Sequence, residues 1–183
     1  MLISQQKLKE NIAEYILYMY QMEDIIRAYK FDVEQIIENY AKPQLPDASF
    51  IGQYRSWLLN LIDEMKSSRA EKQGHIVSLS EIMAELNYLH NTLLNVTKDV
   101  KYTDVYERAV PFLDEFKEKS DKKQANHIEM AFQAMYMKLL LKLQKKEISA
   151  ESEEAFDSMR IMLSYLSRGY HKMKAGDLDF LKN

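Results

Sequence analysis

The sequence contains no cysteine, and glycine and proline are scarce, with four and three residues among 183. Without cysteine, the chain has no disulfide framework, no thiolate metal site and no cysteine nucleophile. So few glycine and proline residues supply little punctuation for tight turns, which argues against an all-β fold. These absences favour a protein that is stabilised by the packing of apolar side chains.

Long apolar runs and an excess of positive charge are also missing. No run approaches the roughly 18 apolar residues of a membrane span, and the amino terminus lacks the apolar core of a signal peptide. The formal net charge is −3, whereas nucleic-acid-binding domains usually carry a clear basic excess. We therefore expect a cytoplasmic protein without a membrane or nucleic-acid partner.

Most chemical motifs are absent as well. None of the four histidines has a carboxylate residue three positions before it, so the Glu-x-x-His pair of carboxylate-bridged metal centres does not occur. The glycines are isolated, which excludes a glycine-rich phosphate-binding loop, and His-Glu-x-x-His does not occur. No Gly-x-Ser-x-Gly nucleophile elbow is found. The sequence thus predicts no catalytic residue, no cofactor-binding residue and no metal ligand.

Apolar residues recur with helical spacing along nearly the whole chain. With 46% hydrophobic residues, the chain has ample material for a sizeable core. We predict an all-α fold, an antiparallel bundle of six to seven helices in a single domain over residues 1–183, with the first, sixth and last helices central. The predicted helices are 4–30, a short helix opened by Asp32, 50–73 capped by Ser49, 78–97, one capped by Thr103 with a kink or restart at Pro111, 123–146, and one capped by Ser149.

The first long segment carries two adjoining apolar stripes that cover about half of a helix surface. Glu23 falls in the middle of the first stripe, and Arg27 follows one turn later. We predict that Glu23 is buried and bonded to Arg27, or to a polar group of another helix such as His90. The stripes are Leu8, Ile12, Ile16, Met19 and Ile26, and beside them Tyr15, Tyr18, Met22, Ile25 and Tyr29.

Glu23, Arg27 and His90 are the candidate ligand-binding residues. A buried Glu23–Arg27 pair is either a site that binds a ligand or positions a proton, or a structural ion pair that compensates a buried carboxylate. His90 lies beside an apolar stripe on its own predicted helix, so it is either a ligand contact or base, or a hydrogen-bonded core histidine.

Arg69 and His75 form a second constellation. Their spacing resembles the Arg-x(4–6)-His motif of the HEPN class of helical nucleotide-binding and ribonuclease domains, in which both side chains project from a helix toward a shared site. Gly74 is expected to end the predicted helix before His75, which departs from that pattern. The resemblance implies a ribonuclease or a nucleotide-binding protein.

Three segments resemble an uncharacterised bacterial family, a domain of unknown function of gut-type anaerobes. They are 11–24 (NIAEYILYMYQMED), 85–94 (ELNYLHNTLL) and 167–170 (SRGY), and the likeness runs along nearly the whole chain. The resemblance implies an all-helical cytoplasmic protein with no assigned activity and no catalytic residues.

Two functions follow from these observations. The first is a non-enzymatic interaction or scaffold protein, which forms a homodimer through aromatic residues such as Tyr18 or Tyr29 if one apolar stripe is left uncovered. The second is a small-molecule or nucleotide-binding protein with a polar pocket near Glu23, Arg27 and His90. A deep polar cavity favours the second function, and a filled bundle with an exposed apolar face favours the first.

Overall fold

The computed structural model describes residues 2–177 and 179, and this part of the chain is helical with no β-strand. The prediction of an all-α fold is confirmed. The elements in chain order are α1 (Ile3–Glu10), α2 (Ile12–Ala28), α3 (Val33–Ile36), the π-helix η1 (Ile37–Ala41), the 3-10 turn η2 (Lys42–Gln44), α4 (Phe50–Ser67), α5 (Val77–Asn91), the π-helix η3 (Thr92–Val96), α6 (Val100–Lys119), α7 (His127–Leu143) and α8 (Ala150–Lys174).

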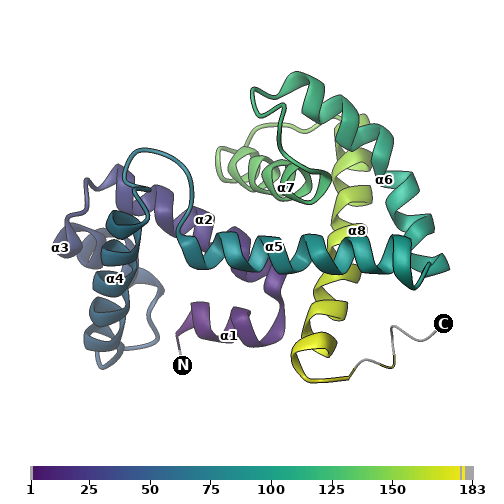
Figure 1. Cartoon of the computed structure of the whole chain (residues 1–183). Coiled ribbons are helices and arrows are strands. Elements are labelled where there is room, and N and C mark those ends of the chain that lie inside the picture. The colour runs from purple at the N-terminus through teal and green to yellow at the C-terminus, as the bar shows by residue number, and fades with distance from the viewer. Residues whose placement is uncertain (1, 178, 180–183) are drawn as a thin grey trace.

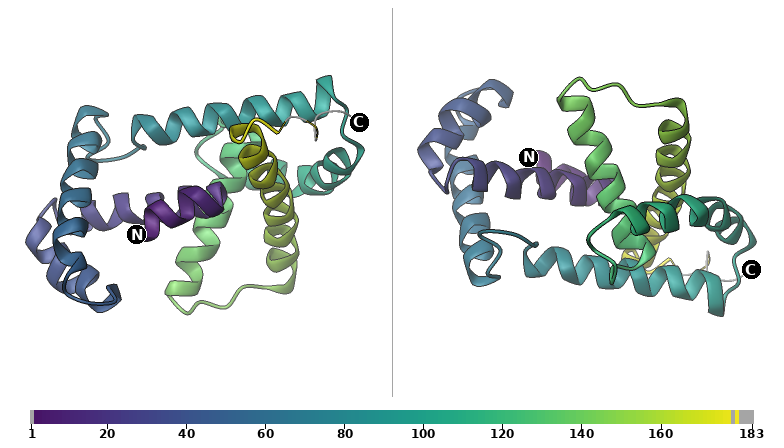
Figure 2. Two further views of the ribbon diagram at one scale, coloured as in Figure 1. Left: turned by 90° about the horizontal axis from the view of Figure 1, so that it is seen from below. Right: turned by 90° about the horizontal axis from the view of Figure 1, so that it is seen from above.

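The helices form two groups that α2 and α5 connect (Figures 1 and 2). α3 and α4 lie at one end, whereas α6, α7 and α8 pack together at the other. α8 contacts α2, α5, α6 and α7, and it crosses behind α5 in Figure 1. The segments expected to be central therefore correspond to α2, α7 and α8, while an antiparallel bundle order stays a prediction.

The first long segment is divided at Asn11, where a single helix over 4–30 was expected. The Asn11 side chain accepts hydrogen bonds from the backbone N–H groups of Ala13 and Glu14, at 3.1 and 3.2 Å, so it caps the start of α2. Side chains of α8 satisfy polar groups at this break. The Ser167 hydroxyl donates to the side-chain oxygen of Asn11 at 2.9 Å, and the Ile12 N–H donates to His171 Nε2 at 3.0 Å. This division adds one helix to the predicted count.

Buried apolar side chains of both helix groups belong to one cluster. In α2 the cluster contains Ile12, Ile16, Met19 and Ile26 of the first predicted stripe, together with Tyr20 and Met22. Leu8, the remaining member of that stripe, lies before the break and is 43% exposed. None of the helices within residues 2–177 combines the length and the apolar character needed to cross a membrane. The assignment of residues 1–183 to a single domain stays a prediction, and residues 1, 178 and 180–183 lie outside the described part.

Most α-helices begin at a residue whose side chain accepts a hydrogen bond from the backbone of the first turn. Asp32 caps α3 and Ser149 caps α8, as predicted. α6 begins earlier than expected, because Asp99 accepts the Tyr102 N–H at 2.8 Å and leaves Thr103 inside the first turn. The same helix continues through Pro111 without a restart.

α4 is shorter than predicted and ends at Ser67 instead of Gln73. Arg69 has a φ of 56° and Gly74 a φ of 81°, so the backbone is left-handed at two positions between α4 and α5. The resulting loop 68–76 returns along α2. It carries His75 to the middle of that helix.

Candidate functional site

Glu23 lies within the apolar stripe of α2 and is fully buried, with 0% of its surface exposed. The prediction that this carboxylate is buried is confirmed. An isolated buried carboxylate would be very costly, so its oxygen atoms need hydrogen-bond donors nearby.

Both donors come from the loop 68–76. The Nδ1 atom of His75 lies 2.6 Å from Glu23 Oε2, and the Ile76 N–H donates to Oε1 at 2.9 Å. With Glu23 as a carboxylate, which only accepts hydrogen bonds, this contact assigns the proton to Nδ1 of His75. The second ring nitrogen, Nε2, forms no hydrogen bond with any described residue.

Arg27 does not pair with Glu23, which corrects the prediction of an ion pair between them. Its guanidinium donates to the backbone oxygens of Ala70, at 2.8 and 3.1 Å, and of Gly74, at 2.6 Å. It also forms an ion pair with Asp24 at 2.8 Å. The planar guanidinium presents five donors, and the reversed loop presents carbonyl oxygens to it. Glu23 and Arg27 thus hold the same loop at two points.

Aromatic rings fix the position of the His75 imidazole. The Tyr20 ring stacks on it with a centroid distance of 3.8 Å and an interplanar angle of 14°. Tyr136 packs edge-on against Tyr20 at 5.7 Å, and its hydroxyl donates to Asp24 at 2.6 Å. The imidazole is therefore held by a carboxylate on one edge and a ring on one face, while 30% of its side-chain surface stays exposed.

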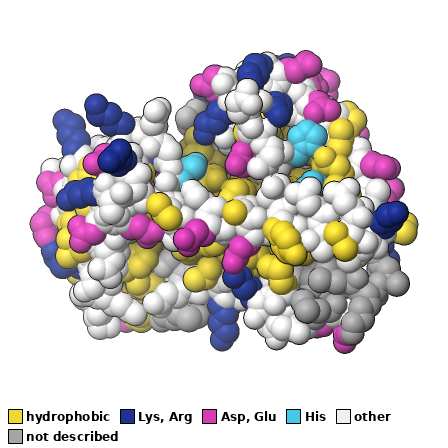
Figure 3. Space-filling model, in the orientation of Figure 1, with side chains coloured by type: hydrophobic (Ala, Val, Ile, Leu, Met, Phe, Trp, Pro, Cys, Tyr) yellow, Lys and Arg dark blue, Asp and Glu magenta, His cyan; other side chains and the backbone are white. Residues whose placement is uncertain are grey.

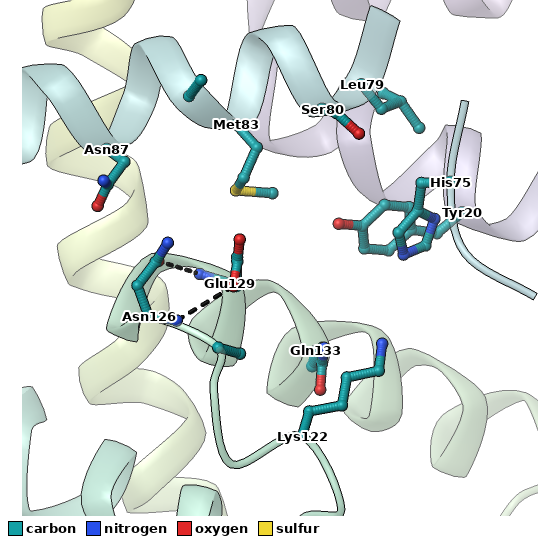
Figure 4. Close-up of a pocket in the computed structure, with 12 residues that line it drawn as sticks. Tyr20, His75, Leu79, Ser80, Met83, Asn87, Lys122, Asn126, Glu129 and Gln133 are labelled. Atoms are coloured by element: carbon teal, nitrogen blue, oxygen red, sulfur yellow. Dashed lines mark hydrogen bonds between the residues drawn. The ribbon is translucent and has the colours of Figure 1, made fainter. Parts of the chain in front are cut away.

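His75 and Tyr20 line a cavity of about 420 Å³ between α2, α5 and the start of α7 (Figure 4), which we name the Tyr20 cavity. The side chains drawn in Figure 4 converge on it from these separate elements. Its lining residues are Tyr20, His75, Leu79, Ser80, Met83, Ala84, Asn87, Lys122, Ala125, Asn126, Glu129 and Gln133.

Several polar groups of the Tyr20 cavity have no hydrogen-bond partner among the described residues. These are the Tyr20 hydroxyl, His75 Nε2 and the side-chain amides of Asn87 and Gln133. Burial, together with the negative charges of Glu23 and Glu129, raises the pKa of the Tyr20 hydroxyl, so this group stays protonated and can donate.

The start of α7 supplies a carboxylate to the cavity. The Asn126 side chain accepts the N–H groups of Ile128 and Glu129, while Glu129 Oε2 accepts the Asn126 N–H at 3.1 Å. This reciprocal capping box holds Glu129 at the cavity wall and leaves its other oxygen without a partner among the described residues. The helix starts at His127, whereas a start near Lys123 was predicted.

His90 belongs to a different cluster, so the three candidate residues do not form one pocket. Its Nδ1 lies 2.6 Å from the Tyr102 hydroxyl, and its ring packs edge-on against Tyr106 at 4.8 Å. The Tyr106 hydroxyl is bonded to His127 Nδ1 at 2.7 Å. None of Glu23, Arg27 and His90 lines the Tyr20 cavity. Asn87, one turn before His90 on α5, does.

The environment of His90 predicts a pH dependence of stability. Burial, and then the charge of His127, lowers the pKa of His90 from 6.5 to about 4. A folded-state pKa below the unfolded value means that the unfolded chain binds more protons, so stability is complete above pH 6.5 and is lost as the pH falls toward 4. We expect a loss of about 1 to 2 kcal/mol, since solvent screens part of the ring.

His90→Gln keeps a polar side chain but removes the titration. In urea unfolding at stepped pH, the wild type should lose stability relative to His90→Gln between pH 6.5 and 4. Groups that titrate equally in both proteins cancel in this difference. A difference that stays constant across the range would contradict the prediction.

Arg69 and His75 do not share a helix, because α4 ends at Ser67 and both residues lie in the loop 68–76. Of the two, only His75 lines the Tyr20 cavity. The arrangement that the HEPN resemblance implied, with both side chains projecting from one helix, is therefore not formed.

Sequence reasoning missed Tyr20, Asn87, Glu129 and Gln133 as lining residues. One signal was available, because Asn126-His-Ile-Glu129 has the spacing of a capping box and marks a helix start. No pattern connects α7 to the loop 68–76, since the packing of α7 against α2 and α5 brings them together.

Within residues 2–177 and 179, no three histidine, aspartate or glutamate side chains gather as a metal-ligand set. On the face shown in Figure 3, basic and acidic side chains are interspersed. The Tyr20 cavity is therefore best described by its hydrogen-bonding groups, of which His75 is held in place from behind by Glu23.

Comparison with known proteins places the chain in a family but adds no activity. No curated protein and no solved structure matches the chain significantly. The family model described as Domain of unknown function (DUF4924) matches residues 1–177, and the chain therefore belongs to this family.

Proposed function

We infer that the protein binds a small polar molecule in the Tyr20 cavity. The observation that carries this inference is the Glu23–His75 pair, in which a fully buried carboxylate holds an imidazole whose Nε2 has no partner among the described residues. Burying a carboxylate is costly, and a purely apolar core would not need a carboxylate to position a histidine. Polar groups held in a fixed orientation beside a cavity favour a binding site.

The groups around the cavity indicate the chemistry of the ligand. The Tyr20 hydroxyl donates, His75 Nε2 accepts when the ring is neutral, and the Asn87 and Gln133 amides do both. Lys122 and Glu129 add one charge of each sign. A cavity of about 420 Å³ lies in the range of small-molecule sites. This set suits a neutral or zwitterionic molecule with several hydrogen-bonding groups.

A role as an interaction or scaffold protein that forms a homodimer remains the other candidate from the sequence. The prediction of a homodimer assumed that one apolar stripe of the first segment is left uncovered for a second subunit. In that stripe Met22 is buried, and Tyr18 and Tyr29 are partly buried against the core of the same chain. Little of these rings is free for a second subunit, so the geometry favours the small-molecule proposal.

The proposal is tested by thermal shift against nucleosides, monosaccharides and free amino acids, followed by calorimetric titration of each stabilising compound. We expect at least one compound to raise the melting temperature. Asn87→Leu and Gln133→Leu should each weaken its binding about tenfold, because each removes hydrogen bonds to the ligand.

Asn60→Leu is the matched control, since Asn60 is exposed on α4 and does not line the cavity. It should leave the affinity unchanged. The proposal fails if no compound in the three classes stabilises the protein. It also fails if the stabilising compounds bind Asn87→Leu and Gln133→Leu as tightly as the wild type.

A further inference from the structure

A second cavity, of about 440 Å³, lies at the other end of the molecule, where α1 and α2 meet η1 and α4. It shares no lining residue with the Tyr20 cavity. Leu2, Ile3, Leu45 and Phe50 contribute apolar walls. We name it the Tyr54 cavity after one of the three tyrosines that line it.

Three phenol groups and two side-chain amides give the Tyr54 cavity its polar character. The phenols belong to Tyr18 on α2, Tyr40 on the π-helix η1 and Tyr54 on α4, and the amides to Gln6 on α1 and Gln44 on η2. Burial is the main cause that raises the pKa of each phenol, so all three stay neutral. π-helical turns occur frequently at functional sites.

The Tyr54 hydroxyl lies between two polar neighbours. It donates to the sulfur of Met22 at 3.7 Å, and it also interacts with the Tyr18 hydroxyl. A thioether is a weak acceptor, and a hydroxyl has two lone pairs that can accept. The hydroxyl therefore keeps capacity to accept a hydrogen bond from a ligand.

Charge is absent from the walls. Among the described residues that line the Tyr54 cavity there is no aspartate, glutamate, lysine, arginine or histidine. An anionic or cationic ligand would lose its hydration there without gaining a counter-charge. An uncharged apolar molecule would lose little hydration and would bury its surface against the aromatic and aliphatic walls.

We propose that the Tyr54 cavity is a second binding site, which takes a neutral, largely apolar molecule with one hydrogen-bonding group directed at the tyrosine hydroxyls. The site is independent of the Tyr20 cavity, and neither proposal depends on the other. Apolar walls with a few convergent polar groups are the usual composition of a small-molecule site.

Trp57 provides a built-in reporter, because it is the only tryptophan of the chain. Its ring lies 5.3 Å from the Tyr54 ring and 6.2 Å from the Tyr18 ring, measured between centroids. A fluorescent ligand in the Tyr54 cavity would lie close enough to Trp57 to accept its excitation energy.

The test uses two probes that differ in charge. N-phenyl-1-naphthylamine is neutral and carries one N–H group, whereas 8-anilino-1-naphthalenesulfonate has the same rings and an anionic sulfonate. Titrated into the full-length protein, the neutral probe should saturate and quench Trp57 emission. The sulfonate should bind about tenfold more weakly. Absence of saturable binding by the neutral probe, or equal binding of both probes, would overturn the proposal.

Variants locate the bound probe. Ala41→Met adds atoms at a buried position of the cavity wall and should abolish energy transfer, whereas Ala48→Met makes the same change at an exposed position that does not line the cavity. Tyr54→Phe keeps the ring and should weaken binding about threefold by removing the hydroxyl. If Ala41→Met fails to fold, Tyr54→Phe decides alone. Unchanged binding in Tyr54→Phe, or in a folded Ala41→Met, would refute the assignment.

Discussion

Replacement of Glu23 by leucine is expected to lower the free energy of unfolding by about 3 kcal/mol. Leucine has a similar size, so the loss does not come from a large cavity. It comes from the Ile76 N–H and His75 Nδ1–H, which would both lose their acceptor beside a fully buried position. Urea unfolding of the purified variant measures this difference.

Glu23→Gln separates lost hydrogen bonds from lost charge. The glutamine oxygen can still accept the Ile76 N–H, and its NH₂ group can donate to His75 Nδ1 if the imidazole proton moves to Nε2. We expect a cost below about 1 kcal/mol. Nitrogen NMR of the histidine ring should show the proton on Nδ1 in the wild type and on Nε2 in the variant.

Glu14→Leu is the control on the same helix, because the Glu14 side chain is 57% exposed and, among residues 2–177 and 179, pairs only with Lys7. It should change stability by less than about 1 kcal/mol. If Glu23→Leu costs no more than Glu14→Leu, the hydrogen bonds of Glu23 do not stabilise the fold as described.

Arg27→Met should cost about 2 kcal/mol, since it removes charged donors from the backbone oxygens of Ala70 and Gly74. The loop 68–76 would then be held to α2 by the hydrogen bonds of Glu23 and by the stacking of Tyr20 on His75. Hydrogen exchange of the Ile76 amide tests this directly, because its acceptor Glu23 is unchanged in the variant. Faster exchange at Ile76 means that the loop has loosened.

Arg55→Met offers a matched control, because Arg55 is bonded only to the carboxylate of Glu34 at the surface. Its cost should stay below about 1 kcal/mol. Because Glu23 and Arg27 hold the same loop, the double variant Glu23→Leu/Arg27→Met should lose less than the sum of the single losses. Strict additivity together with unchanged exchange at Ile76 would contradict the shared role.

The sequence was sufficient for the fold class and for the burial of Glu23. Both depend on apolar periodicity, which is a local property of each helix. The caps at Asp32 and Ser149 were predictable for the same reason, since an N-cap contacts backbone within its own first turn.

The partners of Glu23 and Arg27 were not predictable. An i, i+4 rule considers one helix only, whereas Glu23 binds His75, which is 52 positions away, and Arg27 binds loop carbonyl oxygens. Backbone carbonyl oxygens carry no side-chain signal in a sequence. The Tyr20 cavity depends in the same way on how α2, α5 and α7 pack. The sequence therefore singled out only His75 of its wall, as part of a different motif, and Glu23, which is hydrogen-bonded to His75.

The closure of the Asn11 break has a consequence for biosynthesis. The groups that satisfy Asn11 and Ile12, those of Ser167 and His171, are synthesised 156 and 159 positions later. These contacts cannot form before α8 has left the ribosome. The junction of α1 and α2 therefore reaches its final state only after α8 has emerged, and a nascent chain stalled before Ser167 would present this junction to chaperones and proteases.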